Sequence, residues 1–177
     1  MANIVFIATS LDGYIADKDG GLDWLHSIPN PDNIDMGFVP LLERVDALVM
    51  GRNTLEAVLS FDVDWPYSKP VFVLSNTLKE VPSGYQDKVF LVSGNLPDIV
   101  KDLNAQGYQD LYIDGGVTIQ NFLKLDLIDE LAITTIPVVL GGGVKLFGEL
   151  DGLQKYKMLE SKVYLDAIVQ SRYLRQR

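Results

Sequence analysis

Short apolar runs rich in β-branched residues recur along the chain, and they constrain its fold more than any other feature. The runs that we predict to be strands are Asn3–Thr9, Ala47–Met50, Pro70–Leu74, Lys88–Val92, Leu111–Ile113 and Glu130–Val139. The last of these turns at Pro137 in its interior. Continuous apolar runs are typical of strands that are covered on both faces. Because helices usually cover such strands, the pattern predicts an α/β fold.

Segments with helical spacing separate most of these strands, as parallel pairing requires. They are Gly37–Glu43, Thr54–Leu59, the stretch from Asn95 to Gly107, and Gly115–Leu125. Asn95 is a predicted N-cap, with Pro97 in the first turn that follows it. The segment Ser10–Asn33 is long and rich in Gly, Asp and Pro, and a loop of this length in a compact domain is either disordered or functional.

The C-terminal part of the chain alternates apolar and polar residues in Tyr156–Tyr164 and Ile168–Leu174, which predicts a hairpin around Leu165–Ala167. With the preceding pattern, this indicates a single domain over residues 1–177. We expect a three-layer α/β fold with a mainly parallel central sheet and antiparallel C-terminal strands. The hairpin is a candidate dimer element, although its alternation equally suits a sheet edge packed on the core.

Charge and composition exclude several classes of function. The 15 basic and 24 acidic residues give a formal net charge of −9, which disfavours nucleic acid and anionic membranes as partners. The chain has no cysteine and one histidine, His26, which excludes disulfide scaffolds, cysteine-based metal sites and thiol nucleophiles. No segment has the features of an export signal or a bilayer span, so we expect a cytoplasmic location. If the protein is an enzyme, a bound cofactor carries the chemistry.

Small residues follow the predicted strands, at the sheet edge where α/β proteins bind ligands. Gly51–Thr54 follows the second strand, and Gly115-Gly116 follows the fifth. Backbone amides at helix N-termini favour phosphate, and Arg52 could add a guanidinium fork. An ordinary helix start capped by Asn53 or Thr54 is the simpler alternative. The sequence has no Rossmann fingerprint, P-loop, nucleophile elbow or set of residues with metal-ligand spacing.

Several short motifs occur in order along the chain. They are Ile7–Ala16 (IATSLDGYIA), Met50–Thr54 (MGRNT), Leu74–Asn76 (LSN), Ile113–Gly116 (IDGG) with Phe122-Leu123, Asp129–Leu131 (DEL), Ile136–Gly143 (IPVVLGGG) and Leu146-Phe147. Their combination resembles the dihydrofolate reductase-like fold and, more closely, the reductase domain of the riboflavin-biosynthesis enzyme RibD. Together they cover nearly the whole chain. The resemblance implies an NADPH-dependent reductase, often a homodimer.

The resemblance also implies a cofactor site. The residues that it places at the nicotinamide are Ala8 and Ile15, whereas the Gly51 loop would hold the pyrophosphate and adenosine side. The segment after the third strand would meet the adenosine and the 2′-phosphate. The implied cofactor-binding residues are Ala8, Ile15, Gly51, Arg52, Asn53, Thr54, Leu74, Ser75, Asn76, Asp114, Gly115, Gly116, Val117, Thr118 and Ile119.

On the substrate side, the resemblance points to Asp35, in the register of the carboxylate that binds the pterin ring in dihydrofolate reductases. Asp35 is therefore the candidate catalytic and substrate-binding residue, although a solvated acid or a helix cap explains it equally well. Asp12 and Trp24 belong to the long Ser10–Asn33 segment, the predicted lid, and are further candidate substrate contacts. Asp114 stands where dihydrofolate reductases typically have a third glycine, which disfavours the folate reaction.

These observations predict hydride transfer from NADPH to a small heterocyclic substrate, most like 5-amino-6-(5-phosphoribosylamino)uracil. Dihydrofolate reduction is the alternative within the reductases. A regulatory protein that binds NADPH without catalysis is the alternative from another class. The expected partner is a pyrimidine or pteridine, with no nucleic acid, no membrane and no metal ion.

Overall fold

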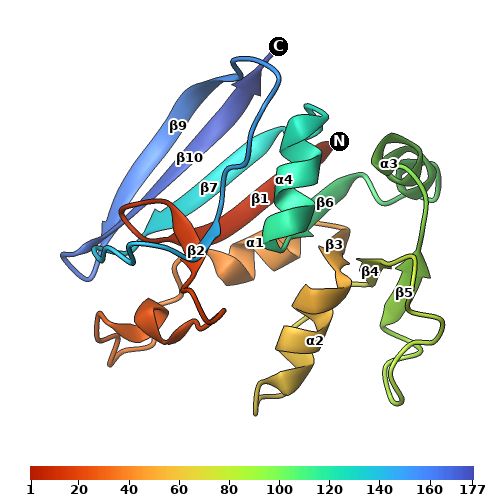
Figure 1. Cartoon of the computed structure of the whole chain (residues 1–177), viewed down its shortest axis with the longest axis horizontal. Helices are drawn as coiled ribbons and strands as arrows, with labels where there is room; N and C mark the ends of the chain where they lie inside the picture. Colours follow the sequence, from red (N-terminus) through yellow and green to blue (C-terminus); the bar gives the residue numbers. More distant parts are fainter.

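An eight-stranded sheet with the order β5-β4-β3-β6-β1-β7-β10-β9 forms the centre of the molecule (Figure 1). The computed structural model describes residues 1–177. The mutually parallel strands are β1 (Ala2–Thr9), β3 (Ala47–Gly51), β4 (Val71–Leu74), β5 (Val89–Val92), β6 (Asp110–Asp114) and β7 (Glu130–Thr135). Each overlaps one of the predicted apolar runs. The predicted α/β fold with a mainly parallel sheet is confirmed.

Helices cover both faces of the sheet and complete the three layers. The helices α1 (Phe38–Arg44) and α2 (Arg52–Ser60) pack on one face, and α3 (Leu96–Ala105) and α4 (Gly116–Lys124) pack on the other. The predicted N-cap of α3 is confirmed, because the Asn95 side chain accepts a hydrogen bond from the Asp98 amide at 3.0 Å. None of the helices combines the length and the apolar character of a membrane span.

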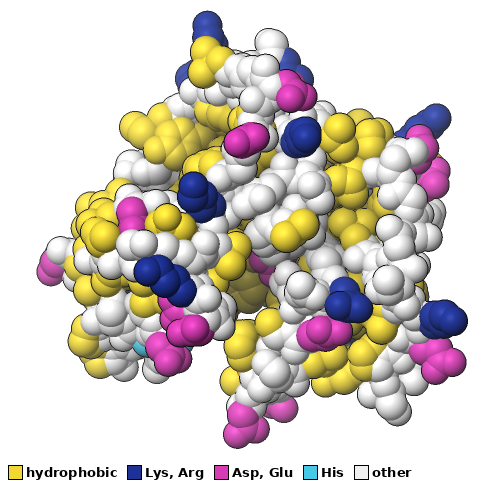
Figure 2. Space-filling model, viewed as in Figure 1, with side chains coloured by type: hydrophobic (Ala, Val, Ile, Leu, Met, Phe, Trp, Pro, Cys, Tyr) yellow, Lys and Arg dark blue, Asp and Glu magenta, His cyan; other side chains and the backbone are white.

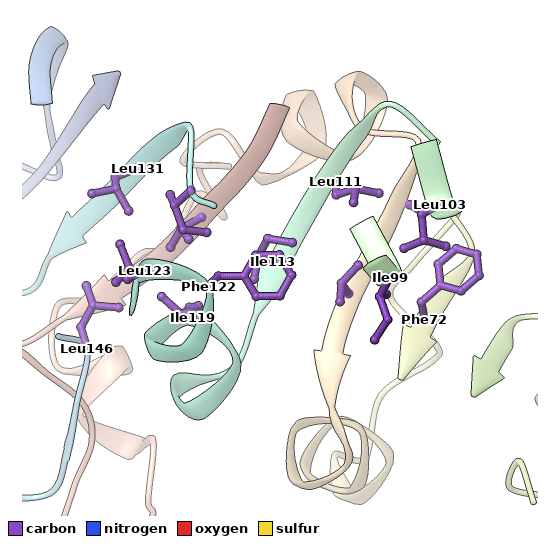
Figure 3. Packing of buried hydrophobic residues seen from close by; sticks show 14 residues of the cluster. Phe72, Ile99, Leu103, Leu111, Ile113, Ile119, Phe122, Leu123, Leu131 and Leu146 are labelled. Carbon is purple, nitrogen blue, oxygen red and sulfur yellow. The ribbon is translucent and has the colours of Figure 1, made fainter. Parts of the chain in front are cut away.

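The larger hydrophobic cluster lies between the sheet and the α3/α4 layer (Figure 3). Ile119 and Phe122 of α4 point toward Ile113 of β6, and Ile99 of α3 points toward Phe72 of β4. The side chains of Ile113, Ile119 and Phe122 are fully buried. Burial of each such side chain contributes about 1.5–3 kcal/mol, so this packing fixes the helices whose N-termini shape the functional site.

The C-terminal hairpin extends the sheet on the β7 side. Its strands are β9 (Lys155–Tyr164) and β10 (Ile168–Gln176), which pair in antiparallel fashion as predicted. Strand β10 also pairs antiparallel with β7, and β9 forms the outer edge (Figure 1). The turn residues Leu165 and Asp166 have φ angles of 54° and 53°, which join the two strands tightly.

Two predictions about the connecting segments were wrong. The strand predicted over Glu130–Val139 ends at Thr135. The Ile136 amide still bonds to the Thr9 carbonyl, but Pro137 has no N–H to continue the ladder. The segment Ser10–Asn33 is not all loop, because it contains β2 (Tyr14–Ala16) and a 3-10 helix, η1 (Asp23–His26). Strand β2 pairs with β8 (Val144–Lys145), just after the glycine run.

Candidate functional site

A cavity of about 560 Å³, the large cavity below, lies at the carboxyl ends of β3, β4, β5 and β6. Loops at the starts of α2, α3 and α4 supply most of its walls. Its lining residues are Gly51, Arg52, Asn53, Thr54, Leu74, Ser75, Asn76, Val92, Ser93, Gly94, Leu96, Ile99, Gly116, Val117, Thr118, Asn121 and Val144. Three segments predicted to bind the cofactor, Gly51–Thr54, Leu74–Asn76 and Gly116–Thr118, therefore meet around one space.

Two helix N-termini face this cavity without a capping side chain. Helix α2 starts at Arg52, directly after β3, and helix α4 starts at Gly116. No side chain accepts a hydrogen bond from the first amides of either helix. The alternative in which Asn53 or Thr54 caps α2 is therefore wrong. Uncapped first-turn amides and the positive end of the helix dipole favour an anion such as a pyrophosphate.

The glycines of the β6–α4 junction allow the two phosphate loops to approach each other closely. Gly115 has a φ of +91°, and a Cβ atom there would overlap the Thr54 Oγ1 atom. A Cβ atom on Gly116 would lie 2.8 Å from Ile15 Cδ1 and 3.1 Å from Val144 Cγ1. Glycine at these two positions thus lets the β6–α4 junction pack directly against Thr54, Ile15 and Val144.

Arg52 is the only lysine or arginine in the lining of this cavity. Its Nη1 donates to Thr77 Oγ1 at 3.2 Å, and its Nε lies 3.4 Å from Glu56 Oε1. The Arg52 side chain is 44% exposed, so it can reorient toward a bound anion. Lys and Arg side chains are scattered over the face shown in Figure 2, without gathering into one patch. Positive potential in the cavity therefore comes from Arg52 and the helix amides.

Asp114 lies at the end of β6, between this cavity and the α1 side of the sheet. Its Oδ1 accepts a hydrogen bond from the Gly115 amide at 2.8 Å. Burial raises the pKa of Asp114 to about 6, against the opposing effect of hydrogen bonds from Gly115 and Tyr112. The charge of Asp114 in turn adds to the effect of burial in raising the pKa of Tyr67. A carboxyl group with this pKa holds a proton on part of the molecules near neutral pH.

A second cavity, about 280 Å³, lies across β1 and β7 on the α1 side of the sheet. Its lining residues are Phe6, Ala8, Leu25, His26, Ile28, Asn30, Met36, Phe38, Thr134, Ile136 and Ile168. The two cavities lie over neighbouring parts of the sheet, because β1 follows β6 in the strand order, and they share no lining residue. Tyr112 of β6 donates from its hydroxyl to the Phe6 carbonyl at 3.1 Å, and Asp114 of the same strand lines neither cavity.

The remaining predicted cofactor residues lie outside the lining of the large cavity. Ala8 lines the second cavity. Ile15 of β2 packs beside Gly116, at the rim of the large cavity. Ile119 is 0% exposed and packs in the core, where its side chain has no surface for a ligand. Most of the cofactor-binding residues predicted from the sequence thus come together around the large cavity. Ala8 lines the second cavity instead, and Ile119 is buried.

Asp35 lies on the surface beside the second cavity. Its carboxylate accepts hydrogen bonds from the Phe38 amide at 3.2 Å and from the Val39 amide at 3.2 Å. This is the helix-capping arrangement that the sequence left open beside a catalytic one. Its neighbours Met36 and Phe38 line the cavity, whereas Asp35 itself does not.

Asp12 and Trp24 have structural surroundings that the sequence did not indicate. The Asp12 carboxylate accepts hydrogen bonds from Ser10 Oγ at 2.6 Å and from the amides of Leu140 and Gly141. These bonds, with Ser10 first, lower the pKa of Asp12 to about 2 despite some desolvation. Through these hydrogen bonds, Asp12 connects the segment after β7 to the end of β1. Trp24 lies in η1, next to the cavity residues Leu25 and His26.

Other lining residues were missed by sequence reasoning. In the large cavity these are Val92, Leu96, Ile99, Asn121 and Val144. Ser93 and Gly94 also line it, and the sequence indicated them as small residues directly after the fourth predicted strand. In the second cavity, every residue except Ala8 was missed. These residues come from β1, η1, α1, β7 and β10, and no local motif links them.

Comparison with known proteins identifies related sequences. The family model of the RibD C-terminal domain matches residues 3–169. The protein YwjB of Bacillus subtilis is 35% identical over 175 residues, which is 97% of each chain. A crystal structure from Shewanella sp. PV-4, of a protein named for riboflavin biosynthesis, has 71% identity and a TM-score of 0.98 over 100% of both chains.

More distant solved structures share the fold alone. The deaminase/5-amino-6-(5-phosphoribosylamino)uracil reductase of Thermotoga maritima has a TM-score of 0.73 at 15% identity, over 99% of this chain and 56% of that one. Dihydrofolate reductase of Enterococcus faecalis, in complex with NADP(H), has a TM-score of 0.64 at 19% identity, over 99% and 97% of the two chains. The predicted dihydrofolate reductase-like fold is therefore confirmed.

Proposed function

The chain belongs to the RibD C-terminal domain family, and on that premise we propose that it is an NADPH-dependent reductase of a small heterocyclic substrate. The observation that carries this proposal is the cavity of about 560 Å³, where uncapped α2 and α4 N-termini and Arg52 face one space. When bound there, NADPH would supply a hydride, and one proton would complete the reduction of one double bond.

The chain's own residues fit this cofactor. The first amides of α2 and α4 would bind the pyrophosphate oxygens, and Arg52 would add a charged donor. The loop of Leu74–Asn76 would face the adenosine end, where the Ser75 hydroxyl holds the turn by accepting from the amides of Thr77 and Leu78. This arrangement leaves the nicotinamide end to the rim formed by Ile15, toward Ala8 and the second cavity.

The second cavity would hold the substrate, and an acidic side chain near it would donate the proton. Asp114 supports this role because its pKa of about 6 lets the carboxyl hold a proton near neutral pH. Asp35, the candidate from the sequence, remains a proposal, although its carboxylate is engaged by the first amides of α1. Asp114→Asn and Asp35→Asn variants distinguish the two: loss of turnover with intact NADPH binding identifies the proton donor.

The alternatives make different predictions in one assay. NADPH binding is followed by quenching of tryptophan fluorescence, and turnover by NADPH oxidation with pyrimidine, pteridine and carbonyl compounds. Turnover supports the reductase, and the compound consumed separates 5-amino-6-(5-phosphoribosylamino)uracil from dihydrofolate. Tight binding without turnover of any compound would favour the regulatory protein. Absence of NADPH binding would refute the proposal.

The predicted homodimer and cytoplasmic location are also retained as proposals. The edge strand β9 supports a dimer, because Met158, Leu159 and Val163 are 57%, 46% and 65% exposed. Exposed apolar side chains on an unpaired edge strand favour pairing with a second copy. A Val163→Glu variant should convert the dimer to a monomer in light scattering, and a wild-type protein that is monomeric would contradict this.

A further inference from the structure

The second cavity, next to Ala8, has a chemical character that restricts what can bind there. We propose that it takes an uncharged, largely apolar ring without a phosphate or carboxylate arm, an inference that rests on the reductase function proposed above. Phe6, Phe38 and Met36 form its α1 side, and Ile136 and Ile168 are 3% and 2% exposed beneath them. A volume of about 280 Å³ suits one or two fused rings.

The lining of this cavity contains no lysine and no arginine. A phosphate or carboxylate that leaves water for an apolar site costs several kcal/mol unless a cation or several donors receive it. His26 is the only titratable residue in the lining, and it is exposed at the rim. The one cation of the large cavity, Arg52, is placed to meet the anionic cofactor. An anionic arm would therefore be buried here without a partner.

The nearest cluster of cations lies in the neighbouring cavity between α1 and β10, where three cations are paired with two carboxylates. Arg44 and Arg172 both bind the buried carboxylate of Glu130, at 2.9 Å and 2.7 Å. Arg172 also binds Glu160 at 2.8 Å, and Lys162 lies 3.3 Å from the same carboxylate. Each cation is thus already engaged by a carboxylate, and a phosphate arm would have to compete with Glu130 or Glu160 for it.

Gln170 lies between this charged cluster and the second cavity. Its Nε2 donates to the Met36 carbonyl at 2.7 Å and to Thr134 Oγ1 at 2.8 Å. Met36 and Thr134 line one cavity and Gln170 lines the other, so the amide forms a bridge between the segment before α1 and β7. The Gln170 side chain is itself buried, with a residue exposure of 6%. A buried amide held by two hydrogen bonds therefore lies between the second cavity and the arginines.

The polar groups inside the cavity suit a neutral ring. Thr134 Oγ1 accepts from Gln170, so its own hydroxyl proton is free to donate to a ring carbonyl or nitrogen. The Asn30 side chain accepts from the Ile34 amide at 2.9 Å and donates one of its two N–H groups to the Ile34 carbonyl at 3.1 Å. A few uncharged donors among apolar walls suit a ring with one polar edge.

Two matched pairs of compounds test this inference. The first is 5-amino-6-(ribosylamino)uracil and its 5-phosphate, and the second is 6,7-dimethyl-7,8-dihydropterin and 7,8-dihydrofolate. Binding to the NADP⁺-loaded protein is measured by thermal shift and tryptophan fluorescence, at the same pH and ionic strength for both members of each pair. We expect the uncharged member of each pair to bind at least about 10-fold more tightly than its charged analogue.

A pair of variants separates the cavity from the overall charge of the protein. Ile28→Arg introduces a cation at the cavity wall, and Leu153→Arg introduces the same charge at a side chain that is 83% exposed and outside both cavities. Ile28→Arg should strengthen binding of the phosphate about 10-fold relative to wild type, and Leu153→Arg should leave it unchanged.

The outcomes distinguish this inference from the proposed function. Equal binding within each pair, tighter binding of the charged members, or no binding of any member would overturn the inference while NADPH binding stands. Loss of NADPH binding itself, measured first without substrate, would instead remove the proposed function.

Discussion

Replacing Gly115 with alanine tests whether the two phosphate loops depend on a bare backbone at their contact. Gly115 has a φ of +91°, a conformation that costs an L-residue about 1–3 kcal/mol. The new Cβ would also overlap Thr54 Oγ1, and overpacking of this kind costs about 1–3 kcal/mol. Gly115→Ala should therefore lower the free energy of unfolding by about 2–6 kcal/mol, or lower Tm by about 5–20 °C for a chain of this size.

Gly84→Ala is the matched control, because Gly84 has a φ of +89° and nothing lies within 4 Å of the position that a Cβ atom would take there. It should cost only the backbone contribution of about 1–3 kcal/mol. Thr54→Ala removes the overlapping oxygen and leaves the Thr54 Cβ at 3.3 Å, so the double variant should recover most of the excess. Unfolding in urea gives the free energies of wild type, Gly115→Ala, Thr54→Ala and the double variant, and from them the coupling between the two positions. The reasoning is refuted if Gly115→Ala costs no more than Gly84→Ala, or if Thr54→Ala gives a coupling below about 0.5 kcal/mol.

Three further predictions concern charged groups. Arg52→Gln should weaken NADPH binding about 10- to 100-fold in titration calorimetry, whereas Glu56→Gln, which releases Arg52 from its ion pair, should not weaken it; equal affinities for wild type and Arg52→Gln would contradict this. Glu130→Gln should lower stability by about 2–4 kcal/mol at neutral pH. Burial raises the Glu130 pKa, but hydrogen bonds from two arginines outweigh burial and hold this pKa below the ordinary value of 4.5. The stabilisation by Glu130 therefore exists above pH 4.5 and is lost as pH falls through the lowered pKa. A difference in stability between wild type and Glu130→Gln that persists at pH about 2 in urea unfolding would argue against this prediction. Because burial raises the Asp114 pKa from 3.8 to about 6, wild type should lose stability as pH rises between these values. Asp114→Asn should then be more stable by about 1–3 kcal/mol above that range, and parallel pH profiles of the two proteins would contradict it.

The strands and the phosphate loops could be predicted because their signals are local. Asn3–Thr9 and Ala47–Met50 are apolar without interruption, and a strand covered on both faces needs only that. Gly51–Thr54 follows directly on such a strand, so its place at a strand-to-helix junction depends on neighbours in the chain. The edge of the sheet at which the site lies could also be predicted, because parallel strands bring their carboxyl ends together at one edge.

Local signals failed where a competing local explanation was just as good. Asp35 precedes a helix, and the same sequence pattern fits a carboxylate that caps the helix and a carboxylate that belongs to a functional site. In the structure, the Asp35 carboxylate accepts hydrogen bonds from the Phe38 and Val39 amides. Asp12 is similar, since only the fold brings Leu140 and Gly141 to its carboxylate.

The sequence by itself determined the strands, their alternation with helices and the small residues that line the large cavity, because each depends on residues close together in the chain. Only the tertiary structure decided the strand order, which inserts β6 between β3 and β1, and with it the burial that raises the pKa of Asp114. It also decided the apolar character of the second cavity, whose walls run from Phe6 to Ile168, and the pairing of Arg44 and Arg172 with Glu130. Contacts between residues so far apart in the chain depend on how the layers pack, and no pattern within one segment encodes them.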